Sequence, residues 1–405
     1  SNSLGVPDTA NVHNIFIDTD AQINIYEGGV LRIAGNLSGD GIIDSRDGEM
    51  VGITDTQRIQ PSRFTNKTVK TLKIGNTGGV LSIDSNTDTL RVSDKIVFGT
   101  HHATLYTNDR LVLVSNEHST ASVADMTSDG VNTGVYEGNR IIGKVTVERY
   151  IPQHYKAWQF LAAPAKGQTI KDAWQEGNVT LGNTQAGYGT IITSNVPSAI
   201  SQGFDIQTPG SSFKQYDAAT NTWLNVPSTI QPIENTSAYM LFVRGDRSVT
   251  ASNQTSTATT LRVTGNLYTP VDNPPSPVQV LANKFEAIGN PYASAIDFSK
   301  LNKSGGIQDA FYVWDPRLTN TVNGNYGFGA YQTFVGLGDG NYRVIPGGGS
   351  YGDPGTLQRG YIQSGQAFFV RSVAEAGGIN FEESAKVGGS AIVTRSSSVR
   401  NAALS

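Results

Sequence analysis

Short stretches in which apolar and polar residues alternate run along almost the whole chain. Three examples are NIFID (residues 14–18), KTLKIG (70–75) and AFFVRS (367–372). Gly, Asn, Asp and Pro interrupt such stretches roughly every eight to fifteen residues, which is the spacing of strands and turns. The pattern predicts an all-β protein. Helical periodicity is confined to two short segments, TIKDAWQEG (169–177) and SAIDFSKLN (294–302).

The N-terminal region, residues 1–143, contains a repeat. GGVLRI at residues 28–33 returns as GGVLSI at residues 78–83. Each copy offers only one or two apolar side chains on one face, too few to form a core alone, although stacked copies could form one. We therefore predict a β-solenoid-like stack here. The alternative is an ordinary β-sandwich with longer strands.

The rest of the chain contains a second repeat with three matching pairs of segments. Pro164 to Pro291 spans the same length of sequence as Phe242 to Phe369, whereas the members of the middle pair lie closer together. Insertions at different surface loops of two related domains explain the shifted middle pair. The pairs are WQFLAAP (158–164) with FEAIGNP (285–291), FKQYDAATNTW (213–223) with FYVWDPRLTNT (311–321), and MLFVRGD (240–246) with AFFVRSV (367–373).

These repeats divide the remaining chain into two related β-sandwich domains. The first is predicted over residues 144–270 and the second over residues 271–387, which are ordinary lengths for this architecture. The linker is expected in the proline-rich segment 268–279, because proline cannot join a central strand. The polar tail, residues 388–405, is predicted to be flexible.

An Arg-Gly-Asp tripeptide, a known cell-attachment signal, occurs at residues 244–246. In the sequence alignment of the two repeats, Arg244 matches Arg371, which is followed by Ser and Val instead of Gly and Asp. The strand end is then the shared feature, and Gly245-Asp246 is one way of making the turn after it. We interpret the tripeptide as a turn.

Composition narrows the possible functions. The chain has no Cys, which excludes disulfides, thiolate metal sites and a cysteine nucleophile. Charged residues make up 16%, well below the roughly 25% of an average soluble protein, and the net charge is −4 without a basic run. We therefore predict no nucleic-acid partner. No apolar run approaches the roughly 18 residues of a membrane span.

Few residues suggest chemistry. Asp44, Asp47 and Glu49 place carboxylates around a predicted turn, which is a possible calcium site although the spacing departs from that of an EF-hand. Trp223, in a turn-rich segment, and Tyr331, in an insertion of the second repeat, are candidate exposed aromatics for binding a glycan. For both, packing against the protein is the alternative.

No catalytic motif is present. There is no His-Glu-x-x-His helix motif and no Gly-x-Ser-x-Gly elbow among the five His and the many Ser residues. Solenoids can host polysaccharide-cleaving enzymes, which need two carboxyls across a groove. The sequence gives no sign of such a groove. We predict that the chain is not an enzyme and uses no cofactor, apart from the possible calcium.

An ordered series of motifs carries a family resemblance. VTVERYIP, WQFLAAP, GYGTIIT, LRVTGNL, AIGNPYASAIDF and YIQSGQAFFVRS follow one another, after GNLSGDGIID and the GGVL repeats. The series resembles the C-terminal portion of large, adhesin-like secreted proteins of Bacteroidetes that use the type IX secretion system. The resemblance covers nearly the whole chain and implies a cell-surface location. It also implies a sorting domain that is removed, so a matured product is expected to end as this chain does.

Taken together, these observations predict a non-catalytic extracellular module at the cell surface, structural or adhesive, such as a subunit of a filament or stalk. Its expected partners are other surface proteins or copies of itself. A glycan-binding accessory module for polysaccharide capture is the alternative. A small solenoid polysaccharide-cleaving enzyme is a third hypothesis.

Overall fold

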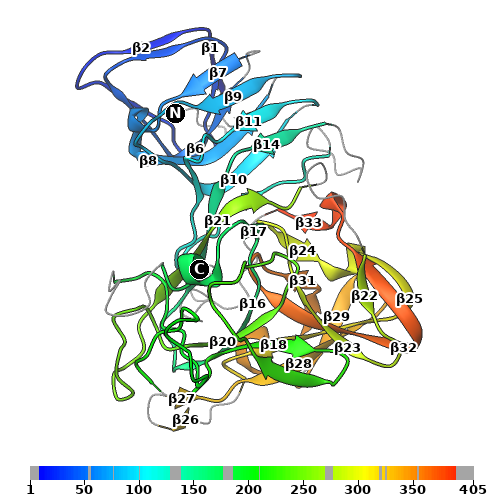
Figure 1. The fold of residues 1–405 in the computed structure, drawn as a ribbon. Coiled ribbons are helices and arrows are strands. Elements are labelled where there is room, and N and C mark those ends of the chain that lie inside the picture. Colours follow the sequence, from blue (N-terminus) through cyan, green and yellow to red (C-terminus); the bar gives the residue numbers. More distant parts are fainter. Residues whose placement is uncertain are drawn as a thin grey trace.

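The fold is described from a computed structural model of the chain. The described residues are 9–52, 56–75, 77–99, 101–127, 138–176, 186–208, 210–269, 277–318, 322–323, 326–353 and 355–388. The fold is all-β, as predicted: an N-terminal solenoid of about four turns precedes a region of antiparallel sheets (Figure 1). No helix in these ranges is long and apolar enough to cross a membrane.

The solenoid has three faces of stacked, parallel strands. In one face, Val80 pairs with Thr56 of the turn before and with Thr104 of the turn after, so the two turns on either side have equal lengths. The strands are β1 (Thr9–Val12), β2 (Ile15–Ile17), β3 (Gln22–Asn24), β4 (Val30–Ile33), β5 (Leu37–Gly39), β6 (Ile42–Gly52), β7 (Thr56–Ile59), β8 (Phe64–Ile74), β9 (Val80–Ile83), β10 (Leu90–Phe98), β11 (Thr104–Tyr106), β12 (Leu111–Leu113), β13 (Ser122–Val123), β14 (Arg140–Ile142) and β15 (Val145–Ile151).

Apolar columns inside the stack hold it together. Leu81 of β9 pairs with Leu105 of β11, which pairs with Ile141 of β14, and all three are buried. Because every rung places its inward residue above the previous one, a short rung gains a core that it could not form alone. The long strands β6, β8 and β10 bend, with register shifts in their ladders, and so serve two faces each.

The two copies of the GGVL repeat have the same turn conformation, but they lie in different faces of the solenoid. Residues 30–33 form β4, in the face that contains β1 and β6, whereas residues 80–83 form β9, in the face of β7 and β11. Gly28 and Gly78 both have positive φ (77° and 69°), which Gly adopts without a steric penalty. The sequence therefore predicted the solenoid correctly from a repeat whose two copies occupy different faces.

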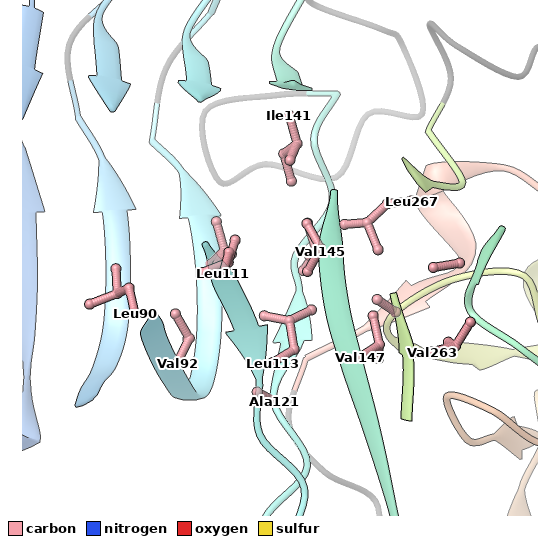
Figure 2. Close-up of a cluster of buried hydrophobic side chains, with 14 of the residues drawn as sticks. Leu90, Val92, Leu111, Leu113, Ala121, Ile141, Val145, Val147, Val263 and Leu267 are labelled. Carbon is pink, nitrogen blue, oxygen red and sulfur yellow. The ribbon is translucent and has the colours of Figure 1, made fainter. Parts of the chain in front are cut away.

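The last rung joins the solenoid to the next domain. Strand β15 pairs in parallel with β12 and, on its other edge, antiparallel with β21 (Thr259–Leu267), from Val145↔Gly265 to Ile151↔Thr259. Buried side chains from β10, β12, β15 and β21 form one cluster across this boundary (Figure 2). The solenoid and the first repeat therefore share one hydrophobic core.

We call the two repeats copy 1 (residues 144–270) and copy 2 (271–387). Copy 1 contains a four-stranded sheet and copy 2 a seven-stranded one, both antiparallel. Copy 1 contributes β16 (Ala157–Leu161), β17 (Ala165–Lys166), α1 (Ile170–Ala173), β18 (Phe213–Asp217), β19 (Thr222–Asn225) and β20 (Tyr239–Val243). Copy 2 contributes β22 (Val278–Val280), β23 (Phe285–Gly289), β24 (Ala295–Asp297), β25 (Asn302–Asp315), β26 (Val322–Asn323), β27 (Tyr326–Gly327), β28 (Ala330–Gly336), β29 (Asn341–Ile345), β30 (Leu357–Arg359), β31 (Tyr361–Ile362), β32 (Ala367–Asn380) and β33 (Lys386–Val387).

The two sheets repeat one strand order. Copy 1 runs β16-β20-β18-β19, and the corresponding strands of copy 2 run β23-β32-β25-β28. The ladders, however, place Phe242 opposite Trp158 and Arg371 opposite Phe285. When β16 is matched to β23, the ladders make Phe242 correspond to Arg371. The sequence alignment had instead matched Phe242 with Phe369. Arg244 therefore does not correspond to Arg371 in the strand ladders.

The two predicted helical segments are short helical turns. Helix α1 is capped by Thr169, whose hydroxyl accepts a hydrogen bond of 3.0 Å from the backbone N–H of Asp172. The second segment forms a 3₁₀ turn at Phe298–Lys300, capped by Asp297. Most of the predicted linker, residues 270–276, and the tail from residue 389 lie outside the described residues.

Copy 2 also contacts the solenoid directly. The backbone N–H of Val123 donates to the carbonyl of Ala293 (2.9 Å). The N–H of Met126 donates to the carboxylate of Glu383 (2.9 Å), which forms a buried ion pair with Lys386 (2.6 Å). The solenoid is thereby fixed to both copies, through a sheet to copy 1 and through buried polar contacts to copy 2.

A substitution in the shared core tests whether the solenoid and copy 1 unfold together. Leu113 is 1% exposed on the last full rung. We expect Leu113→Ala to lower the free energy of unfolding by about 2–5 kcal/mol. Amide hydrogen exchange should then speed up in both β12 and β21, because one core supports both. Leu337→Ala, at a position that is 42% exposed, is the control. Faster exchange in β12 alone would contradict the shared core.

Candidate functional site

The two copies meet across a cluster of aromatic and small apolar side chains, which we call the aromatic joint. Successive side chains of a strand point to opposite faces, so β20 and β32 each contribute to two cores. In β20, Leu241 points into the core of copy 1 and Met240 into the joint. In β32, Val370 points into the core of copy 2 and Phe369 into the joint. The buried members are Phe160, Ala162, Ala238, Met240, Ala367 and Phe369, and the half-buried ones are Trp158, Tyr216, Trp223, Phe285, Ala287, Tyr312, Trp314 and Tyr331.

Phe369 lies at the centre of the joint. Its ring centroid is 5.1 Å from that of Phe160 and 4.7 Å from that of Tyr216, both in copy 1. Trp223 and Tyr331 lie 5.8 and 5.7 Å from it, with edge-on geometry. Edge-to-face pairs at these separations add to the stabilisation from burial. A single ring of copy 2 therefore contacts three aromatic rings of copy 1.

The two predicted glycan-binding aromatics both belong to this joint. Trp223 lies in β19 opposite Tyr216, and Tyr331 lies in β28 opposite Trp314. Both are half-buried, and both contact Phe369 although they are distant in sequence and belong to different copies. Both therefore pack against the protein and are not fully exposed, and glycan binding by either stays a prediction. The sequence around them did not indicate that each forms an aromatic pair with a residue of the neighbouring strand.

An open groove of about 470 Å³ lies beside the joint, between the two copies. Its copy 1 wall comes from β18, β19 and the segment before β20, and its copy 2 wall from β22 and β23. Tyr216 contributes to both the joint and the groove. The lining side chains include Gln215, Tyr216, Asp217, Leu224, Asn225 and Glu286.

The carboxylates of this groove differ in their electrostatic environments. Burial raises the pKa of Glu286, a hydrogen bond from the backbone N–H of Ala287 opposes that shift, and the nearby Asp217 adds to it. A hydrogen bond from the Thr220 hydroxyl (2.6 Å) lowers the pKa of Asp217. Glu286 forms no ion pair with any residue in the described part of the chain. The groove therefore has a half-buried carboxylate without a counter-charge, in contact with solvent.

The predicted calcium ligands lie in the solenoid. Asp44, Asp47 and Glu49 all fall within strand β6, in the stretch where its ladder with β8 shifts register, and not around a turn. Asp44 is buried, with 9% exposed. The side chains of Asp47 and Glu49 lie outside the described residues. The described residues contain no group of three His, Asp or Glu arranged to hold a metal ion, and calcium binding stays a prediction.

The Arg-Gly-Asp tripeptide is a buried turn, as interpreted from the sequence. Asp246 is 4% exposed and accepts hydrogen bonds from the backbone N–H groups of Ser248 (3.0 Å) and Gly187 (2.5 Å). Gly245 has a φ of 121°. The guanidinium of Arg244 donates to the hydroxyl of Thr208 (3.0 Å). A receptor would have to break these bonds to reach the tripeptide.

The next residue, Arg247, forms the most deeply buried ion pair of copy 1 in the described part of the chain. Its guanidinium donates to Asp205 at 2.8 and 3.0 Å, and both side chains are at most 2% exposed. Gln175 also donates to Asp205 (2.8 Å). The pair anchors the loops around the turn, and removing either partner would leave an uncompensated buried charge.

A second open groove, of about 550 Å³, lies on the solenoid where β5 and β7 are not paired. Its charged groups already have partners: Arg58 lies 3.5 Å from Asp84, and Arg63 lies 3.3 Å from Asp40. These exposed pairs are typical of a solvated surface. We therefore regard the groove between the copies as the stronger candidate site.

The fold and the joint define an all-β protein with a solenoid fixed to a duplicated sheet domain. The chain belongs to the family described as Domain of unknown function (DUF8693), which matches residues 170–401 and so includes most of both copies. No curated protein matches the chain, and neither does any solved structure.

The importance of the joint can be measured through Phe369. Phe369→Ala should lower the free energy of unfolding by about 3–5 kcal/mol, because the side chain is 6% exposed and the cavity left would lie among five aromatic rings. Chemical denaturation followed by Trp fluorescence measures the change. Phe328→Ala, at a position that is 52% exposed, should change stability by well under ~1 kcal/mol. Equal effects of the two substitutions would refute the central role of Phe369.

We expect His154 to make stability depend on pH. It lines a small cavity of about 20 Å³ where copy 1 meets Arg317 of copy 2. Burial lowers its pKa below the ordinary 6.5, and Arg317 lowers it further. As the pH falls below 6.5, His154 binds a proton in the unfolded chain before it does so in the folded chain. The loss of stability therefore begins near pH 6.5 and is complete once the pH is below the lowered pKa of the folded state. Melting temperatures should fall between pH 7 and pH 5, and His154→Gln should reduce that fall. An unchanged fall would contradict this assignment.

Proposed function

We propose that this chain is a non-catalytic, extracellular module of the cell surface that serves as a rigid structural or adhesive unit. One observation supports the proposal above the others: buried contacts hold the solenoid, copy 1 and copy 2 in one fixed arrangement. A sheet and a shared core join the solenoid to copy 1, and the aromatic joint joins copy 1 to copy 2. A spacer or stalk must transmit force between its ends, which requires such stiffness.

The location rests on the sequence. The ordered motifs resemble adhesin-like surface proteins of Bacteroidetes that use the type IX secretion system, and the low charge and lack of Cys are compatible with that origin. The expected partners are other surface proteins or copies of the same chain. Strands β1 and β30 lie at the ends of their sheets' strand orders, and edge strands of this kind can pair with another chain.

Immunogold labelling of intact cells tests the location. Antibodies raised against the purified chain should label unpermeabilised cells of the source organism, and a cytoplasmic marker protein should stay unlabelled in the same cells. Labelling that appears only after permeabilisation would overturn the extracellular role.

Electron microscopy of the purified protein tests what kind of unit it is. We expect particles of one uniform shape at low concentration, because the three parts are fixed to one another. Regular filaments or sheets at high concentration would identify copies of the chain as the partner, and loss of filaments with a chelator would support calcium at their contacts. Particles with many different shapes would contradict a rigid unit.

A further inference from the structure

We propose that the groove between copy 1 and copy 2 binds a short saccharide that lacks acid groups. Such a binding site goes beyond the structural role proposed above and can fail without affecting it. The argument rests on three features of the groove: it is preformed, it contains an uncompensated carboxylate, and it combines polar groups with an apolar surface.

The groove is preformed because the joint fixes its walls. Ser237, in its copy 1 wall, forms a β-bridge with Ile288 of copy 2. Lys284 of copy 2 donates from its ammonium group to the carbonyl of Ala219 in copy 1 (3.0 Å). A site that is already ordered loses little conformational entropy when a ligand binds. Its volume of about 470 Å³ lies within the range of small-molecule sites, roughly 300–1,000 Å³.

The carboxylate of Glu286 is the group in the groove that could best accept hydrogen bonds from a ligand. It accepts a hydrogen bond from the backbone N–H of Ala287. It is nevertheless half-buried, Asp217 lies close enough to disfavour its charge, and among the described residues it forms no ion pair. Even partial burial of a charge is costly when no counter-charge compensates it. Hydroxyl groups of a saccharide could donate to the remaining acceptor positions of the carboxylate, and hydrogen bonds to charged groups are about twice as strong as those between neutral ones.

The other lining groups favour a saccharide over a metal ion or an acidic ligand. The amides of Gln215 and Asn225 can each donate and accept, as the mixed hydroxyls of a sugar require. Leu224 is 52% exposed and offers an apolar surface for the C–H face of a sugar ring. The groove is much larger than a bare metal ion needs, and two carboxylates of the same charge, Asp217 and Glu286, would repel an acidic sugar.

The experiment starts with an array of neutral and acidic glycans probed with the full chain, followed by isothermal titration calorimetry with the best neutral hexasaccharide. We expect binding to at least one neutral glycan and none to oligogalacturonate. Glu286→Gln should weaken binding at least tenfold. Glu375→Gln is the matched control, because Glu375 is an exposed carboxylate of the same copy outside the groove, and it should leave binding unchanged.

Two further measurements separate binding from folding. The melting temperature of the Glu286→Gln variant should equal or exceed that of the parent, because an uncompensated charge has been removed. Should that variant fail to fold, Leu224→Ser, at an exposed position, takes its place and should weaken binding as well. Lowering the pH through the raised pKa of Glu286 should weaken binding of the parent more than that of Glu286→Gln, since protonation removes the charged acceptor.

Several results would overturn the proposal. A blank array would do so, as would binding that Glu286→Gln leaves unchanged. Binding of acidic glycans only would contradict the charge argument. Binding of a hexalysine peptide, with no neutral glycan bound, would assign the groove to basic peptides instead. None of these results bears on whether the chain is a rigid surface unit, which the microscopy and the labelling decide.

Discussion

The arrangement of the whole chain depends on β20 and β32 burying both of their faces. A strand in an ordinary antiparallel sheet buries one face and exposes the other. Here the residues of β20 alternate between the core shared with the solenoid and the aromatic joint, and those of β32 alternate between the core of copy 2 and the same joint. Three apolar layers are therefore stacked around two sheets. Neither sheet could be exposed without uncovering large aromatic side chains, so the copies are expected to stay together.

The duplication also makes the joint possible. Related strands occupy the centre of both sheets, and in each sheet a Tyr–Trp pair lies across two neighbouring strands, Tyr216 with Trp223 and Trp314 with Tyr331. The order of Tyr and Trp is reversed between the copies. Both residues of the copy 1 pair, and Tyr331 of the copy 2 pair, pack against Phe369. The groove between the copies borders this packing, because Tyr216 lines the groove and also belongs to the joint.

Much of the fold could be predicted from sequence because it follows from local signals. Alternation predicted the strands, the GGVL turns predicted a solenoid, and the paired segments predicted two related sheets. What escaped prediction depends on pairing between distant residues. The alignment on Phe-Val-Arg differed from the register of the ladders, since matching letters do not fix register. Trp223 was expected in a turn because Asp217 to Thr222 consists mainly of turn-forming and small residues, yet it lies in a strand and forms a half-buried pair with Tyr216.

The groove could not be predicted from sequence at all. Asp217 and Glu286 lie far apart in the sequence and belong to different copies, so no motif connects them. The calcium prediction relied on a local cluster of carboxylates and placed a turn where β6 continues as a strand. Local clusters are visible in a sequence, but sites at the boundary of two domains are visible only once the domains are packed.

The central claim is that the solenoid and both copies form one rigid body, and a distance measurement tests it most directly. The chain has no Cys, so Arg58→Cys in the solenoid and Glu375→Cys in copy 2 would carry two spin labels at known places. Pulsed electron paramagnetic resonance then gives the distribution of distances between them. A rigid body predicts one narrow distribution in solution. A broad distribution, or two separate distances, would mean that the parts move relative to one another and would contradict this account.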